Sequence, residues 1–432
     1  MTSPSRDRRD FLKATAAVGV TAAAFSPGVH AAGGETIKVG VIGCGGRGNG
    51  AVRNILDADK NVEIVAFGDV FEGQAKNSFN TWKKNKEHGA RIKATPDTVF
   101  EGLDAYQKVL AAGIDLVILA TPPGFRPLHL EAAVKAKKHI FCEKPVAVDA
   151  AGIRKCLSLV EESKKANIAI VAGTQRRHQK GYIETINKIK EGAIGDVISA
   201  RVAWNSGGSP PIWFHARRAG ETDTQYQLRN WYHFLWVCGD HIVEQHVHNL
   251  DVANWVMGDH PIRATGLGGR SGRPGGISGN PNEFGNIWDH YAVEYEYKSG
   301  QRVFSYCKHI AGAESDVSET VFGSKGVSRV NAYMIGKDKV GTDDRDAYVQ
   351  EHIDLLASIR SGKLLNELQQ VTESTFTAIL GRNASYAQRW LKWDDALAAN
   401  EDTMPKDLTM TSKIEVPPAP TPGNWKLPAR GA

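Results

Sequence analysis

The sequence predicts an α/β domain followed by an α+β domain that is built on an open, mainly antiparallel β-sheet. Short apolar runs alternate with helix-like segments as far as residue 172, which is the pattern of βαβ units and a parallel sheet. Beyond that point, residues 197–204 and 291–297 alternate with a period of two, as half-buried antiparallel strands do. The length of 432 residues suits two domains.

A glycine-rich turn organises the first domain. The apolar run at residues 37–42 predicts a buried strand, and Gly43, Gly45 and Gly48 follow it in the spacing G-x-G-x-x-G. Such glycines allow a tight turn, close approach of a pyrophosphate and close packing of the following helix. The N-terminus of that helix would then present free N–H groups to the phosphates.

An acidic residue stands where a nucleotide ribose would lie. Residues 51–58 have helical spacing, residues 62–67 predict the next strand, and Asp69 closes that strand. A carboxylate there would accept hydrogen bonds from the adenosine ribose and repel a 2′-phosphate. We therefore expect a Rossmann dinucleotide-binding domain over residues 36–174 that takes NAD, with NADP less favoured. The alternative is a glycine-rich turn of an unrelated α/β protein.

The other elements of the first domain follow in chain order. Helices are expected at about residues 72–87, 104–112, 128–137 and 150–165, and strands at 114–120, 139–142 and 168–172. Thr121-Pro-Pro ends the strand at 114–120, because proline cannot donate to the ladder.

The second domain is expected over residues 175–395. Its strands include residues 302–307 and a strand–turn–strand at 320–330, and helices over 351–363 and 372–390 close it. Long irregular segments at 206–229 and 266–285 interrupt the sheet. Residues 396–432 form a proline-rich tail, expected to be extended and either solvated or packed along a neighbour.

Composition excludes several classes of protein. The formal net charge is only +5, which does not argue for a nucleic-acid or anionic-membrane partner, and no apolar run approaches the ~20 residues of a membrane span. The five cysteines are odd in number and lack a C-x-x-C spacing. They therefore suggest neither a disulfide framework nor a zinc site, and buried free thiols are expected.

The first 32 residues look like a twin-arginine export signal. Arg8 and Arg9 precede Phe11 and Leu12, and a mildly apolar run then leads to an Ala-x-Ala-like site near residue 31. The alternative is a basic, disordered N-terminus. The signal predicts a periplasmic or otherwise exported protein that folds before export, in agreement with cysteines that stay free.

Several motifs together resemble the Gfo/Idh/MocA family of sugar and cyclitol oxidoreductases. They are the glycine turn, Asp69, Thr121-Pro-Pro and Glu143-Lys144-Pro145, and the resemblance extends over residues 37–393. It implies an NAD-dependent enzyme and a small-molecule carbohydrate substrate. The residues expected to contact the cofactor are Gly43, Gly45, Gly46, Arg47, Gly48, Asp69, Thr121, Pro122, Glu143 and Lys144.

The resemblance also implies a catalytic group. The family carries D-x-x-x-H-x-x-D, and the matching stretch here is Glu244-Gln-His-Val-His248-Asn-Leu-Asp251. His248 matches the catalytic histidine and Lys144 the lysine of the Glu-Lys-Pro motif, whereas Glu244 replaces an aspartate and is one methylene longer. Without the resemblance, we would interpret His248 as a core or helix-capping histidine. Histidine exchanges protons near neutral pH, and burial beside a nicotinamide cation disfavours a lysine ammonium, so both suit proton transfer from a hydroxyl.

A metal site is the competing interpretation of this stretch. His241, His246 and His248 with Glu244 contain an H-x-H pattern that binds zinc in some proteins. Hydride transfer in this family needs no metal, so no metal is predicted.

Aromatic rings and forked donors suit the recognition of sugars, so residues of these types are the candidate substrate contacts. Each of them alone is more often a packing or surface residue. These are Gln175, Arg176, Arg177, Tyr182, Trp204, Trp231 and His248. The first hypothesis is an oxidoreductase that oxidises one hydroxyl, and the second a redox-neutral NAD-dependent glycosidase. The third is a non-catalytic sugar-binding protein. The open sheet predicts a homodimer or homotetramer.

Overall fold

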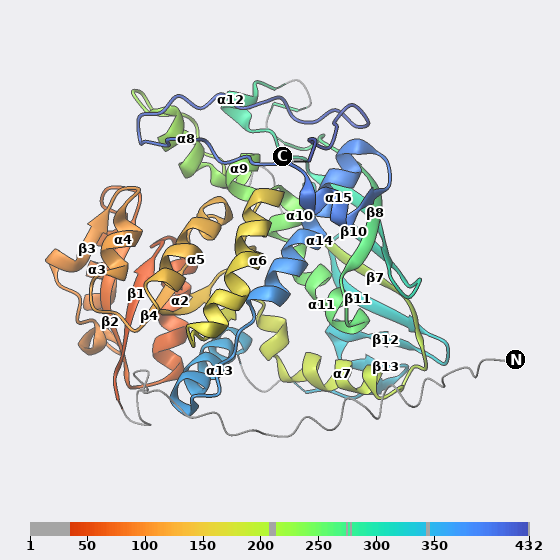
Figure 1. Cartoon of the computed structure of the whole chain (residues 1–432), viewed down its shortest axis with the longest axis horizontal. Helices are drawn as coiled ribbons and strands as arrows, with labels where there is room; N and C mark the ends of the chain where they lie inside the picture. The colour runs from red at the N-terminus through yellow and green to blue at the C-terminus, as the bar shows by residue number, and fades with distance from the viewer. Residues whose placement is uncertain (1–34, 207–212, 274, 277–278, 343–345, 431–432) are drawn as a thin grey trace, which may run out of the picture. The chain divides into compact units, whose positions relative to one another are not determined.

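The computed structural model describes residues 35–206, 213–273, 275–276, 279–342 and 346–430. The predicted export signal, residues 1–32, lies outside the described residues. Residues 35–430 contain two β-sheets and the helices that cover them (Figure 1). Among the residues described, no helix is both long enough and apolar enough to cross a membrane.

The first sheet is parallel and has six strands in the order β3-β2-β1-β4-β5-β6. The strands are β1 (Ile37–Ile42), β2 (Val62–Asp69), β3 (Val99–Glu101), β4 (Leu116–Leu119), β5 (His139–Cys142) and β6 (Ile170–Ala172). The chain direction across the sheet reverses between β1 and β4, which leaves a crevice beyond their carboxyl ends. This arrangement confirms the predicted Rossmann-type domain.

Helices pack on both faces of this sheet. They are α2 (Gly46–Ala58), α3 (Gln74–Lys83), α4 (Ala105–Leu110), α5 (Arg126–Lys135) and α6 (Ala150–Lys165). Apolar residues of α2 and α3 share one buried cluster with the sheet, and those of α4, α5 and α6 share the other.

Helix α13 (Ala347–Ser361) crosses the predicted domain boundary. Its residues Leu355, Leu356 and Ile359 lie in the same buried cluster as α2, although the sequence assigns them to the second domain. The first domain is thus completed by a helix from near the end of the chain. Its apolar spacing predicts a helix, but nothing in it specifies which sheet the helix covers.

The second sheet has nine strands in the order β14-β13-β12-β11-β7-β10-β9-β8-β15. The strands are β7 (Val197–Ser206), β8 (Pro261–Gly269), β9 (His290–Tyr297), β10 (Arg302–His309), β11 (Asp316–Gly323), β12 (Val327–Arg329), β13 (Met334–Ile335), β14 (Asp338–Lys339) and β15 (Leu391–Lys392). Every neighbouring pair is antiparallel except β7 and β10. The predicted mainly antiparallel sheet is confirmed.

One face of this sheet is covered and the other is open. Alternate residues of β9 and β10, such as Tyr295 and Val303, are fully buried beneath α11 (Val247–Met257) and α14 (Leu368–Ala387). Large apolar side chains stay exposed in this sheet: Ile198, Leu267, Phe304, Tyr306, Val317, Phe322 and Val327.

Short helices occupy the connections between these layers. They are α7 (Lys180–Lys190), α8 (Asp223–Arg229), α9 (Leu235–Cys238), α10 (His241–Glu244), α12 (Pro281–Phe284) and α15 (Trp393–Ala398). Two of the predicted irregular segments are therefore partly regular. Thr222 and Gln225 form a reciprocal capping box that starts α8, and β8 extends into the second segment.

The proline-rich tail is extended, and it packs on the rest of the chain while many of its residues stay exposed. It runs past α8, α9 and α12 (Figure 1), and its residues Ile414 and Val416 are buried. The tail therefore packs on its own chain, where the sequence left solvent and a neighbour as the options.

Candidate active site

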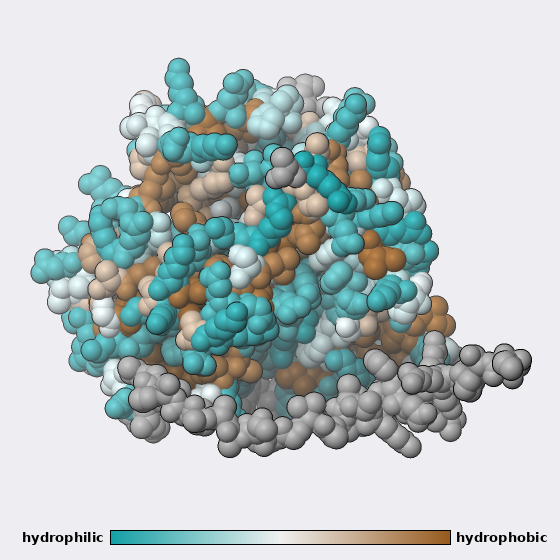
Figure 2. Space-filling view, in the orientation of Figure 1, coloured by the Kyte–Doolittle hydropathy of each residue, from teal (hydrophilic) through white to brown (hydrophobic). Residues whose placement is uncertain are grey.

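A cleft of about 920 Å³ opens beyond the carboxyl ends of β1 and β4. Its walls come from the glycine turn, the end of β2, the loop after β4, and the segment that leads from residue 213 to α10. In the space-filling view the surface is hollowed between α8 and helices α4 and α5, and apolar residues line the hollow (Figure 2). The cleft thus lies where open α/β sheets bind ligands.

The glycines of the turn have different functions. Gly43 has φ +94°, and a Cβ there would lie 2.6 Å from the backbone of Ala120. A Cβ on Gly48 would lie 1.8 Å from the Gly43 carbonyl oxygen, so both positions require glycine for packing. A Cβ on Gly45 or Gly46, by contrast, would meet nothing within 4 Å. The open space over these two residues, at the start of α2, fits a dinucleotide pyrophosphate.

Asp69 lies at the end of β2 and lines the cleft. Its carboxylate accepts hydrogen bonds from the backbone N–H of Cys44 at 2.8 Å and of Phe71 at 3.0 Å. Burial raises the pKa of Asp69, and these backbone donors offset part of that rise. Asp69 therefore ties the glycine turn to the end of β2 beside the space for a ribose.

Thr121 and Pro122 follow β4 and line the same cleft. Below them Arg126 is buried and donates to the carbonyl oxygens of Leu119 and Thr121, both at 2.5 Å. Nε of Arg126 is buried and has no partner among the described residues. The sequence gives no signal for Arg126, because its position under the cleft depends on the turn of the chain after β4.

Arg47 connects the glycine turn to two carboxylates. Its Nε forms a short ion pair with Glu143, and its Nη2 lies 3.4 Å from Glu351 of α13. Burial and the nearby charge of Glu143 raise the pKa of Glu351 well above its ordinary value. The guanidinium also lies 5.0 Å from the ring of Tyr348, which lines the cleft. Arg47 therefore connects α13 to Glu143, the residue that follows β5.

Lys144 and Glu244 meet across the two domains of the fold. Nζ of Lys144 donates to the backbone carbonyl of Glu244 at 2.7 Å and to its Oε1 at 3.1 Å. Both side chains are about one-tenth exposed. Glu244 ends α10, and its other oxygen, Oε2, is buried without a partner in the described part of the chain. The longer glutamate therefore still reaches the lysine.

His248 shares the cleft with Lys144 and Glu244. Its ring stacks on Trp204 with centroids 5.6 Å apart and 22° between the planes. Burial lowers the pKa of His248 well below its ordinary value, and the cationic groups of Lys144 and Arg176 lower it further. The imidazole is therefore neutral near pH 7, the form that has a ring nitrogen able to accept a proton, and the lowered pKa makes it a weaker base than an exposed histidine.

The candidate substrate contacts divide into two groups. Trp204, Trp231 and His248 line the cleft. The lining does not include Gln175, Arg176, Arg177 and Tyr182. Their function as substrate contacts stays a prediction.

The second group is bound to other side chains. Arg176 and Tyr182 contact Glu319 at 2.5 and 3.1 Å. Arg177 makes a forked pair with Asp251 at 2.8 and 2.9 Å, and Gln175 donates to the Tyr348 hydroxyl at 3.2 Å. In the present geometry these residues hold the wall behind Trp204 and α11.

The histidines of the metal interpretation have other neighbours. Nε2 of His246 lies 2.7 Å from the hydroxyl of Ser305, and Nδ1 of His241 lies 3.1 Å from that of Tyr232. Within the described ranges, only Asp57, Glu87 and His88 bring three possible metal-binding atoms together, far from this motif in the sequence.

Several cleft residues were not predicted from the sequence. Tyr348 reaches the cleft from α13, and Trp213, His215 and Leu228 reach it from the segment before α9. Aromatic and basic residues in a long loop were the available signal. Only the folded chain shows which of them face the cleft.

Two family models match the chain. The model described as "Oxidoreductase family, NAD-binding Rossmann fold" matches residues 37–171, and the "GFO/IDH/MocA C-terminal domain" model matches residues 183–329. Together they span most of the described residues and divide them at the same place as the two sheets. The chain belongs to the Gfo/Idh/MocA family of oxidoreductases.

Curated relatives are similar over part of their length. The 2,7-anhydro-N-acetylneuraminate hydratase of Escherichia coli is 28% identical over 249 residues, which are 54% of this chain and 59% of that protein. Inositol 2-dehydrogenase 3 of Saccharopolyspora erythraea is 26% identical over 300 residues, 68% of this chain and 73% of that one. The alignment with the first relative thus covers little more than half of it.

Solved structures of similar fold cover more of the chain. The WlbA dehydrogenase of Bordetella pertussis, in complex with NADH and UDP-GlcNAcA, superposes with a TM-score of 0.64 at 17% identity. The aldose-aldose oxidoreductase of Caulobacter crescentus does so at 0.62 and 15%. Each match covers 83% of this chain and nearly all of the other. At these identities the likeness describes the fold.

Proposed function

We propose that this protein is an NAD-dependent oxidoreductase that oxidises a hydroxyl of a sugar or cyclitol. The main support is the meeting of Lys144, Glu244 and His248 in one cleft with the glycine turn. Proton-transfer groups and a dinucleotide cradle in one cleft are what removal of hydride from a carbinol requires.

The residues have separate tasks in this proposal. NAD, when bound over Gly45 and Gly46, supplies the hydride acceptor. The neutral His248 is able to take the hydroxyl proton, and Trp204 fixes the plane of its ring. Lys144 donates to Glu244 and is placed to bond a substrate oxygen as well, because an ammonium carries three donors. Trp204 and Trp231 offer flat apolar faces for a sugar ring.

Incubation with NAD and a panel of aldoses and inositols tests the proposal. We expect NADH absorbance or a new keto product with at least one of these substrates in the wild type. The Lys144→Ala variant is the matched control and should form neither. A wild type that binds NAD but converts none of these compounds would count against the proposed substrate class.

The NAD preference is part of the proposal. Asp69 lines the cleft at the end of β2, where its negative charge would repel a 2′-phosphate. Comparison of NAD and NADP affinities by calorimetry decides the preference, and equal affinities would contradict it.

A second candidate is a redox-neutral reaction, an NAD-dependent glycosidase or lyase. The observation that favours it is the similarity to a protein named as a hydratase of an anhydro sugar, a reaction without net redox change. Lys144, Glu244 and His248 would then move protons while a leaving group departs. Product chromatography without any accumulation of NADH would distinguish this reaction from a plain dehydrogenation.

Export and assembly complete the proposal. The twin-arginine pattern at residues 8–9 supports export of a folded protein with its cofactor bound, and outside the cytosol a tightly held NAD would be an advantage. The apolar residues on the second sheet, among them Leu267 and Phe304, support a homodimer or homotetramer. Fractionation of cells that produce the full chain tests the export.

A further inference from the structure

The C-terminal segment leaves the second domain and returns to it. We name residues 401–429 the strap. Its two ends are joined, because Ala399 and Arg430 form an antiparallel bridge and the N–H of Asn400 donates to the Ala429 carbonyl at 2.9 Å. The strap is therefore a loop whose two ends are paired with each other, and its middle lies away from this paired base, beside α8 and α12 (Figure 1).

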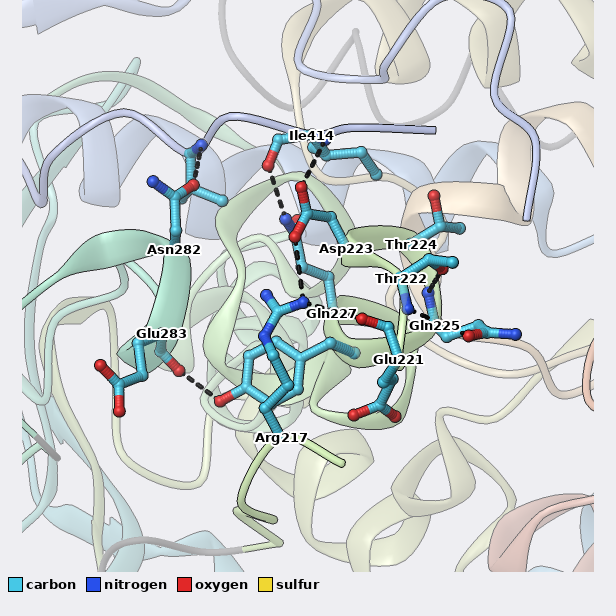
Figure 3. A network of polar contacts seen from close by, with 12 residues as sticks. Arg217, Glu221, Thr222, Asp223, Thr224, Gln225, Gln227, Asn282, Glu283 and Ile414 are labelled. Carbon is cyan, nitrogen blue, oxygen red and sulfur yellow. Dashed lines mark hydrogen bonds and ion pairs between the residues drawn. The ribbon is translucent and has the colours of Figure 1, made fainter. Parts of the chain in front are cut away.

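Residues 410–414 of the strap run beside α8, and every second residue accepts a hydrogen bond from that helix or from its N-cap, Thr222. The carbonyl oxygens of Met410, Ser412 and Ile414 accept hydrogen bonds from Thr222, Thr224 and Gln227, at 2.6, 3.2 and 2.9 Å. The side chains of Asp223 and Gln227 in α8 approach the backbone of Ile414 (Figure 3). Met410 and Thr411 lie in a turn, which the N–H of Ser412 closes on the Thr409 carbonyl at 3.2 Å. Side chains, rather than a backbone ladder, therefore dock the strap on this helix.

The same stretch is also held from the opposite side. The N–H of Val416 donates to the side chain of Asn282 in α12 at 2.8 Å. Asn286 and Trp288 donate to the carbonyls of Pro417 and Pro420, at 3.2 and 2.9 Å. Figure 3 shows Asn282 and Gln227 approaching the strap from different elements. The strap thus connects α8 to α12 and to the start of β9.

Apolar contacts continue this connection to the cofactor cleft. Ile414 and Val416 are buried in one cluster with Leu228, Trp236 and Phe125. Val70, Phe71 and Leu103, which line the cleft beside Asp69, pack against this cluster. The loop after β4 and helix α9 lie close together here, because a Cβ on Gly124 would lie 2.4 Å from the Trp236 carbonyl oxygen.

The strap supports the part of the cleft wall that Leu228, Arg229 and Trp231 form, and this part has little stability of its own. Helix α8 has seven residues, too few to be stable without packing. It carries Leu228 and Arg229 to the cleft, and Trp231 follows directly. We propose that the strap is a positioning element for this wall, with Ile414 as its anchor, and that it sets the rate at which the dinucleotide leaves. This inference rests on the proposed function.

Point variants of the full chain test the anchor. In Ile414→Asp, a charge enters the apolar cluster, and we expect NADH to dissociate at least ~10-fold faster in stopped-flow fluorescence. The conservative variant Ile414→Val should restore the slow rate. Arg430→Ala is the control: it breaks the exposed ion pair with Asp395 at the base of the strap and should leave the rate unchanged.

A second variant covers the case in which Ile414→Asp fails to fold. Residues 404–422 are replaced by a short Gly/Ser linker that keeps the paired base. We expect faster NADH release and faster amide hydrogen exchange in α8 before any cofactor is added, with turnover at saturating NAD reduced less than the affinity.

The outcomes separate this inference from the proposed function. A wild type that binds NADH and releases it no more slowly than the strap-deleted protein overturns the inference alone. The same is true if Arg430→Ala accelerates release as much as Ile414→Asp. A wild type that binds no dinucleotide overturns both the inference and the proposed function.

Discussion

Lys144 donates two hydrogen bonds to one residue, Glu244, at 2.7 Å to its backbone carbonyl and at 3.1 Å to its carboxylate. The lysine follows a strand of the parallel sheet, and the glutamate ends a short helix above the other sheet. The pair therefore connects the candidate catalytic residue of one domain to that of the other.

This pair leads to the first prediction. Lys144→Ala and His248→Ala should each lower turnover at least ~100-fold while NAD remains bound, because a positioned acid or base contributes about that factor. Glu244→Gln should have a smaller effect, since the backbone carbonyl of residue 244 still accepts from Lys144. Steady-state kinetics with calorimetry of NAD binding measures both quantities, and near-normal turnover in Lys144→Ala would refute its assignment.

The second prediction uses the difference between two glycines. Gly45→Val should leave the melting temperature nearly unchanged but abolish NAD binding, because its side chain would enter only the open space of the cleft. Gly48→Ala should instead impair folding, because a Cβ there would lie 1.8 Å from the Gly43 carbonyl oxygen. Thermal unfolding and calorimetry separate the two effects. Unchanged NAD affinity in Gly45→Val would contradict the placement of the pyrophosphate.

The sequence was sufficient for the parts of the fold that local pattern determines. Residues 37–42, 139–142 and 150–165 form the predicted strands and helix with the predicted bounds. Sequence pattern did not reveal that α13 packs on the first sheet or that Ile414 is buried. Both depend on which distant surfaces are left uncovered, and that is decided only when the whole chain folds.

The candidate site divides in the same way. Gly43 was predicted from its spacing, whereas Lys144 and His248 were predicted from the family resemblance, and all three line the cleft. Tyr348 and Leu228 belong to no motif and reach the cleft through packing. Arg177 was predicted as a substrate contact but is bonded to Asp251 instead. The sequence does not distinguish these two partners, because a guanidinium beside a strand end can bind either of them.

Buried histidines give the third prediction, a loss of stability in acid. Burial and the charge of an arginine lower the pKa of His129 and of His246 to about 3. Both are neutral in the folded chain and gain a proton on unfolding below their ordinary pKa of 6.5. The free energy of unfolding should therefore fall as the pH drops below 6.5, by up to about 1.4 kcal/mol per pH unit for each histidine. Urea titrations at pH 7 and pH 5 measure this, and equal values would contradict it.

His178 acts in the opposite direction. Burial alone would lower its pKa, but hydrogen bonds to Asp354 and Glu367 raise it to about 10. Its contribution to stability is therefore complete below pH 6.5 and disappears as the pH rises toward 10. In the same titrations, His178→Gln should flatten the decline in stability between pH 7 and pH 10.

The fourth prediction concerns assembly. Leu267 and Phe304 are 62% and 38% exposed on the second sheet, and burial of such a face favours a symmetric oligomer. The double variant Leu267→Glu, Phe304→Glu should dissociate that oligomer, because it places charges on an apolar contact. Leu128→Glu, at a 44% exposed position on α5, is the matched control. Light scattering that gives a monomer for the wild type at micromolar concentration would contradict the prediction.

The last prediction belongs to the redox-neutral candidate and is that NAD stays bound through many reaction cycles. An exported enzyme has no ready supply of NAD, so one that released NADH would stop after a single turnover, whereas a redox-neutral reaction restores the cofactor in place. Retention at a nanomolar dissociation constant requires about −12 kcal/mol of binding free energy. Leu228 and Trp231 line the cleft and pack in one cluster with the strap, and we expect this wall to support such affinity. Protein purified without added cofactor and dialysed extensively should therefore release about one NAD on denaturation and form product without free NADH. Lys144→Ala should hold the same NAD and form no product. An empty wild-type protein that makes stoichiometric free NADH would restore the plain dehydrogenase.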